Sequence, residues 1–102
     1  MIDMLDDQVT LRRLTASKNQ YGVMETVALD TTIFCDVASV SASEFFAAGQ
    51  SGIHAEYRFT VWADEYDGQQ DVEYLGKQYR VYRTYKPDVD HIELYVEERI
   101  GV

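Results

Sequence analysis

The chain has 102 residues, a length that favours one domain spanning residues 1–102. Its 18 acidic and 9 basic residues give a formal net charge of −9, which argues against binding to nucleic acid or to an anionic membrane, because both require clustered Lys and Arg. The single cysteine, Cys35, excludes an internal disulfide and suits a reducing compartment, and its apolar neighbours favour a core residue over a nucleophile.

An acidic N-terminal segment, residues 1–7, is expected to be an arm that is either mobile or bound to a partner. It has no long apolar run, so no signal peptide is predicted. At the other end, residues 99–102 are expected to be a short tail. The candidate anchors of the arm are Ile2, Met4 and Leu5.

The segment after the arm predicts the first strands. Apolar and polar residues alternate over 8–14, which is typical of a half-buried strand. A polar loop is expected over 15–22, followed by a weaker extended segment over 23–29. Asp30 and Thr31 are expected to interrupt this segment before a strand resumes over 32–40.

The only convincing helix signal begins at Ser41, whose hydroxyl is a candidate N-cap. Glu44, three residues later, is placed to reach back to the Ser41 amide and complete a capping box. Val40 and Phe45 occupy the positions of a hydrophobic staple, and Gly49 offers a left-handed C-cap. A helix of about two turns depends on its flanking strands for stability.

Further strands are predicted in the second half of the chain. The cleanest alternation runs over 54–63, and an acidic turn follows over 64–70. A hairpin over 71–85 turns around Gly76, and the strand over 91–98 closes the domain. About six strands and one short helix predict a mainly β, antiparallel fold, closed as a small barrel or a two-layer sandwich.

No catalytic or metal-binding constellation stands out, so neither an enzyme nor a cofactor is expected. Acidic residues crowd the turn over 64–71, but their spacing does not match a helix–loop–helix calcium site. A solvated acidic turn is favoured over an irregular cation site. His54 and His91 could meet across a sheet, yet no third zinc ligand accompanies them.

The basic residues and the tyrosines each allow two interpretations. Arg and Lys in an acidic chain either contact an acidic neighbour, including a second copy of the subunit, or are ordinary surface charges. The tyrosines form either an exposed recognition face or part of the core, and alternation predicts Tyr79 and Val81 inward with Tyr82 outward. The candidate interface residues outside the arm are Arg12, Arg13, Arg80, Tyr82 and Arg83.

An ordered series of segments carries a family resemblance over roughly residues 8–96. The segments are Val9–Arg13, Ile33–Val37, Ser41–Gln50, Tyr57–Val61, Val72–Val81 and Ile92–Val96. In this order and at this length, the chain resembles the bacteriophage head–tail joining family, also called head-closure or stopper proteins.

The resemblance implies a small β-barrel with its helix inserted between the second and third main strands. It implies a structural protein of the virion neck that is assembled in the host cytoplasm. Such proteins form a homo-oligomeric ring, twelvefold by family expectation, between the portal–adaptor complex and the tail terminator or tail tube. Packaged double-stranded DNA passes through the ring without sequence-specific binding.

The resemblance also assigns a role to the excursion over residues 41–53, which would narrow the DNA channel. Gly49 and Gly52 would let it be helical in one state and extended in another. A tail-completion or tail-terminator protein and a monomeric β-barrel binding module remain the alternatives. The candidate channel and gating residues are Ser41, Glu44, Phe45, Phe46, Gln50, Ser51 and Gly52.

Overall fold

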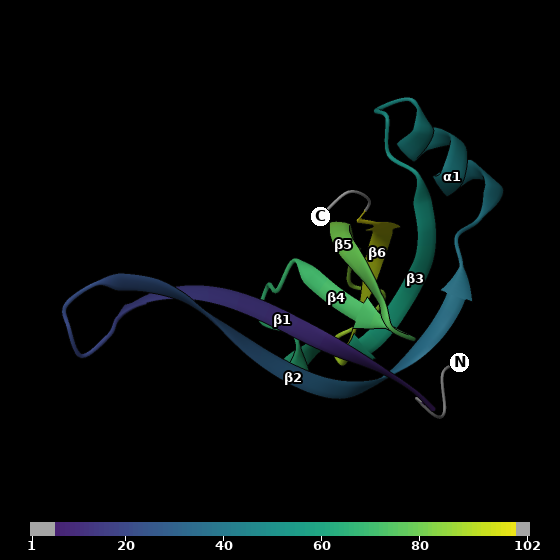
Figure 1. Ribbon diagram of the computed structural model, residues 1–102. Helices are drawn as coiled ribbons and strands as arrows, with labels where there is room; N and C mark the ends of the chain where they lie inside the picture. The colour runs from purple at the N-terminus through teal and green to yellow at the C-terminus, as the bar shows by residue number, and fades with distance from the viewer. Residues whose placement is uncertain (1–5, 100–102) are drawn as a thin grey trace.

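The computed structural model describes residues 6–99, which form a closed antiparallel β-barrel (Figure 1). The strands follow one another in the order β1-β2-β3-β6-β5-β4, and β4 pairs back with β1. The predicted mainly β barrel, with one short α-helix between the second and third strands, is confirmed, and the two-layer sandwich is excluded. The elements are β1 (Asp7–Lys18), β2 (Met24–Ser39), α1 (Ala42–Gly49), β3 (Ala55–Trp62), the 3-10 helix η1 (Ala63–Glu65), β4 (Asp71–Tyr74), β5 (Lys77–Tyr85) and β6 (His91–Glu98).

Several predictions on the chain ends fall outside the described residues. They concern the anchors Ile2, Met4 and Leu5 and most of the C-terminal tail. The boundary of the N-terminal arm was predicted one residue too late, because Asp7 already belongs to β1. None of the helices within residues 6–99 is long and apolar enough to cross a membrane.

The core lies inside the barrel, where alternating apolar side chains of all six described strands meet. Phe59, Leu11 and Leu94 are the largest fully buried side chains. Cys35 is also fully buried, and this burial raises the pKa of its thiol to about 12. The interpretation of Cys35 as a core residue is therefore confirmed.

Three tyrosines complete this core rather than forming an exposed recognition face. Tyr57, Tyr74 and Tyr79 pack around Phe59, with ring centroids 5.8, 5.2 and 6.2 Å from the Phe59 ring. Tyr79 faces inward as predicted and is 4% exposed. The hairpin that carries it turns at Gly76, whose φ of +78° is the conformation that the sequence predicted there.

The first two strands are much longer than predicted. They pair without a break from Asp7 opposite Cys35 to Lys18 opposite Met24, so the predicted loop over 15–22 is confirmed only from residue 19 and the predicted interruption at Asp30–Thr31 is wrong. Asp30 fits inside β2 because it lies opposite Arg12, whose guanidinium donates to its carboxylate at 2.9 and 3.2 Å.

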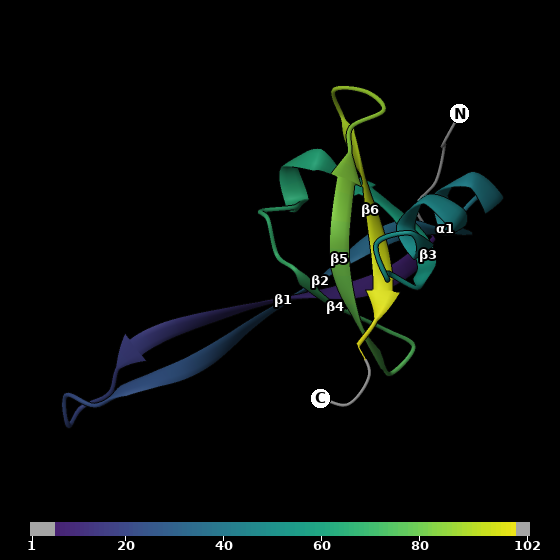
Figure 2. The same ribbon diagram turned by 90° about the horizontal axis from the view of Figure 1, so that it is seen from above.

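The far part of this hairpin leaves the barrel as a two-stranded ribbon, which we call the hairpin arm (residues 13–29). Figures 1 and 2 both show it projecting from the barrel. The last residue of β1 that pairs with β4 is Arg12, opposite Asp71. From there to Lys18 the ribbon extends by about 20 Å at the usual rise per residue. With both faces outside the core, the ribbon needs no apolar alternation, which explains why the sequence pattern indicated a loop.

Candidate functional site

Helix α1 lies outside the barrel wall, on a connection that leaves β2 and returns to β3 (Figure 1). The predicted channel and gating residues all belong to this excursion, four at the start of the helix and three in the turn after it. Among the residues of α1, only Ala48 is buried. The side chains of Phe45 and Phe46 are 45% and 68% exposed and meet edge to face, so neither belongs to the barrel core.

The predicted N-cap is confirmed, but the predicted capping box is wrong. The Ser41 hydroxyl oxygen accepts a hydrogen bond from the Glu44 amide at 3.1 Å. The Glu44 carboxylate makes no return bond to Ser41 among the described contacts. It points instead to β5, where it accepts hydrogen bonds from Tyr82 and Arg83.

The helix also ends differently from the prediction. Gly49 is its last residue and Gln50, the C-cap, has a right-handed φ of −64°. The left-handed residue is Gly52, with φ of +79°, and the Ile53 amide donates back to the Ala48 carbonyl at 3.0 Å. The predicted glycine cap therefore exists, but it lies three residues later, in the turn that leads to β3.

The contacts between Glu44 and β5 form a polar latch, defined here as Glu44, Tyr82 and Arg83. The Tyr82 hydroxyl donates to Oε2 of Glu44 at 2.7 Å, and Nη2 of Arg83 donates to Oε1 at 2.6 Å. Nε of Arg83 adds a longer bond to Oε2 at 3.4 Å. The latch fastens a helix that is otherwise weakly attached to the outer surface of the barrel.

A β-bulge explains how two neighbouring residues reach one carboxylate. Successive side chains on a regular strand point to opposite faces. In β5 the register against β6 shifts between Val81 and Arg83, which leaves Tyr82 as the extra residue. Arg83 is further held by Tyr95, whose ring centroid lies 4.0 Å from the guanidinium carbon.

The contacts of the latch shift the pKa values of Glu44 and Tyr82 in opposite directions. The hydrogen bond from Arg83 lowers the pKa of Glu44, with a smaller contribution from Tyr82, against an opposing effect of burial. Burial, followed by the bond to Glu44, strongly raises the pKa of Tyr82. Glu44 is thus ionised and Tyr82 protonated at neutral pH, which is the pairing that the geometry requires.

The predicted interface residues are largely engaged within the chain. Arg12 contacts Asp30 at 2.9 Å and Glu73 at 3.5 Å. Arg13 contacts the Asp67 carboxylate at 3.0 Å, and Tyr82 and Arg83 belong to the latch. Arg80 is exposed and forms no ion pair with another residue in the range 6–99.

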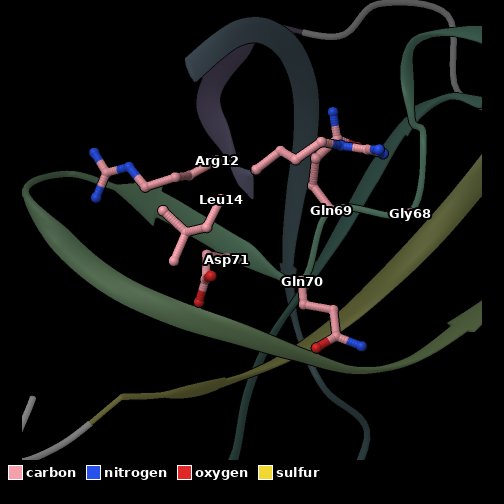
Figure 3. Close-up of a pocket in the computed structure, with 7 residues that line it drawn as sticks. Arg12, Leu14, Gly68, Gln69, Gln70 and Asp71 are labelled. Atoms are coloured by element: carbon pink, nitrogen blue, oxygen red, sulfur yellow. The ribbon is translucent and has the colours of Figure 1, made fainter. Parts of the chain in front are cut away.

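A shallow polar groove of about 300 Å³ lies at the base of the hairpin arm (Figure 3). Figure 3 shows the Arg12 guanidinium pointing away from Gln69 and Gln70, in keeping with its pairing to Asp30. Arg13, which also lines the groove, donates to the Asp67 carbonyl. The groove therefore offers no free convergent charges for a ligand. It is lined by Arg12, Arg13, Leu14, Gly68, Gln69, Gln70 and Asp71.

The acidic turn and the two histidines form no metal site in the part of the chain that the structure describes. Asp67 contacts Arg13, and Asp71 contacts Arg99 at 2.7 Å, so cations of the protein neutralise two of the clustered carboxylates. The histidines do not meet. His91 lies opposite Trp62, at the far end of β3 from His54, and its Nδ1 lies 2.9 Å from Asp88.

In a comparison with known protein families, the chain matches a family described as phage head completion protein. The matched segment is residues 3–99, which includes the whole barrel, the hairpin arm and the α1 excursion. A search of curated proteins finds no match.

Proposed function

The chain belongs to the phage head completion protein family, and from this premise we propose that it forms a ring in the head–tail connector below the portal–adaptor complex. Family membership makes it a structural component of the virion head that acts with other head or tail components. The finer proposal is that a ring of copies, twelve by family expectation, extends and closes the DNA channel and offers the docking surface for the tail terminator or tail tube. Assembly takes place in the host cytoplasm.

The observation that carries the proposal is the α1 excursion, which is folded but lies outside the core. Phe45 and Phe46 contribute little to the barrel interior, so selection for stability alone does not account for them. A segment attached at two strand ends and held mainly by a polar latch is suited to move while the barrel stays folded. We therefore assign residues 41–53 as the part that narrows the channel.

The latch is weak enough to be released. The Arg83 side chain is 43% exposed, so solvent screening limits its ion pair with Glu44 to about 1 kcal/mol or less. The more shielded bond from Tyr82 adds about 1–2 kcal/mol. Their sum is small beside the 5–15 kcal/mol that is typical of the stability of a domain. A new contact of about the same size with a neighbouring ring would be enough to displace it.

The charge of the protein agrees with this role. A net charge of −9 opposes tight binding to phosphates, so DNA can slide past such a surface during packaging and ejection. The proposed contacts between subunits or with the adjoining rings use Arg12, Arg13, Arg80, Tyr82 and Arg83. Because most of these already contact acidic groups of their own chain, assembly would exchange internal pairs for intermolecular ones.

Reconstitution tests the proposed position. The purified protein is mixed with the portal–adaptor complex of its phage and the product is imaged by electron cryomicroscopy. An additional ring of density below the adaptor is expected. Binding to isolated tails with no binding to the portal–adaptor complex would instead identify a tail-completion protein and contradict the proposal.

A further inference from the structure

The hairpin arm is a long ribbon that consists only of two paired strands and the turn at its tip. Six residues of β1, from Arg13 to Lys18, pair with β2 but with no other described strand. A two-stranded ribbon in water is marginally stable by itself, because it has no third strand and no core to cover either face. The arm is therefore expected to gain stability from a surface outside this chain.

The surface of the arm differs from the rest of the protein. Between residues 14 and 29 the only charged side chains are Lys18 and Glu25, so this segment is neutral and the remainder of the chain carries the whole net charge of −9. A ribbon adapted to water would carry more charge. Its exposed large apolar side chains are Leu14, Tyr21, Val23, Met24, Val27 and Leu29, between 36% and 79% exposed.

The tip of the arm is built to hold one shape. The Asn19 side-chain oxygen accepts hydrogen bonds from the amides of Tyr21 and Val23 at 2.9 and 3.1 Å. Gly22 adopts a φ of +77°, which the turn requires and other residues rarely adopt. An arm that is ordered before it binds loses less conformational entropy on docking.

The arm also carries free strand edges. The barrel itself is closed, and β3 pairs with β2 only over Asp36–Ser39. Within the described residues, the outer edge of β2 from Met24 to Cys35 has no partner strand. Such an edge can pair with an extended segment of another chain through backbone hydrogen bonds.

We propose that the hairpin arm docks on a second copy of this chain and forms the contact between neighbouring subunits. Two copies of net charge −9 repel each other, and the arm is the part that can approach without that cost, because residues 14–29 are neutral and its one further charge, Arg13, is positive. Lys18, near its tip, would meet an acidic surface. One Lys is too few for the arm to bind DNA phosphates.

The position of the arm fits a contact of head-to-tail type. Figures 1 and 2 show the arm and α1 on opposite sides of the barrel. A projecting element that binds a different surface of the next copy makes a heterologous interface, which closes into a ring when the rotation allows it. This inference rests on the proposed ring. The contact between subunits can nevertheless be tested without the portal–adaptor complex or the tail.

Photo-crosslinking tests the inference. Full-length protein carries benzoylphenylalanine in place of Met24, which is 57% exposed on the arm, or in place of Val89, which is 84% exposed in the turn before β6. Both are irradiated as concentrated purified protein and in assembled particles. A covalent dimer of twice the 11.7 kDa subunit is expected from position 24, at least tenfold more than from position 89.

A mixture of isotope-labelled and unlabelled subunits confirms that the cross-link joins two copies. The Lys18→Glu change should lower the dimer yield severalfold while leaving the thermal unfolding of the barrel unchanged. Cross-links from position 24 to a different virion protein alone, or no dimer in either sample, would overturn the inference. Failure of the protein to enter particles would count against the proposed function, whereas the dimer in solution would still decide the role of the arm.

Discussion

Glu44 connects three parts of the structure through one carboxylate. Its amide donates to the N-cap hydroxyl of Ser41, while its side chain accepts from Tyr82 and Arg83 on β5. The sequence pattern indicated only the local partner, since Ser and Glu at this spacing are typical of a capping box. The actual partners depend on the β-bulge at Tyr82, which the alternation in β5 does not reveal because it arises from the register against β6.

Replacing Glu44→Gln tests the latch at the residue scale. Glutamine keeps the length of the side chain and can still accept from Tyr82, but it loses the ionic bond with Arg83. We expect the free energy of unfolding to fall by about 1 kcal/mol at pH 7, measured by urea denaturation. The matched control is Glu25→Gln on the hairpin arm, which should change the stability by a few tenths of a kcal/mol at most.

The contribution of Glu44 to the stability of the fold should depend on pH in a defined direction. Since the folded state lowers the pKa of Glu44, its contribution to stability is complete above the usual carboxyl value of 4.5 and is lost as the pH falls through the lowered pKa. The difference in stability between the native protein and Glu44→Gln should therefore shrink as the pH falls below 4.5. A difference that stays constant with pH would show that the charge of Glu44 plays no part in holding α1.

At the scale of elements, the barrel strands were largely predictable from the sequence. The strands over 54–63, 71–85 and 91–98 alternate because one face of each meets the core. The hairpin arm was not predictable in this way, because a ribbon exposed on both faces has no reason to alternate. Polar residues such as Thr15 and Ser17 then resemble a loop, although they lie opposite Val27 and Glu25 in a regular ladder.

The sequence predicted where the candidate site lies, but not how α1 ends or how it is attached to the barrel. The position of α1 and the N-cap at Ser41 follow from local sequence chemistry. The ending of the turn at Gly52 rather than Gly49 was missed, since both glycines were equally suited to a left-handed conformation and only the return path to β3 distinguishes them.

Deleting residues 44–52 tests whether α1 is independent of the barrel. The segment includes Phe45 and Phe46 but few buried atoms, so the deletion variant should keep the β-sheet circular dichroism spectrum and a cooperative thermal transition. By contrast, Leu94→Ala, at a position that is fully buried, should cost about 2–5 kcal/mol. A deletion variant less stable than Leu94→Ala would show that the excursion is part of the core.

The whole molecule combines a closed barrel with two projecting elements of opposite character. The hairpin arm is neutral over residues 14–29 and has free strand edges, whereas α1 is attached to the barrel by an ion pair. The barrel is closed, and within the described residues the unpaired edge of β2 runs from Met24 to Cys35, along the arm and its base, so contacts with other copies are directed there. In the proposed ring, the arm joins subunits and the α1 excursion acts on the channel.

DNA retention by assembled heads tests this account most directly. Tailless heads are filled with DNA and completed either with the native protein or with the variant lacking residues 44–52, and the DNA that remains after nuclease treatment is measured. Both proteins should be present in the particles in equal amounts, and the heads with the deletion should lose most of their DNA. Full retention of DNA by heads that contain the deletion variant would contradict the assignment of the α1 excursion as the part that closes the channel.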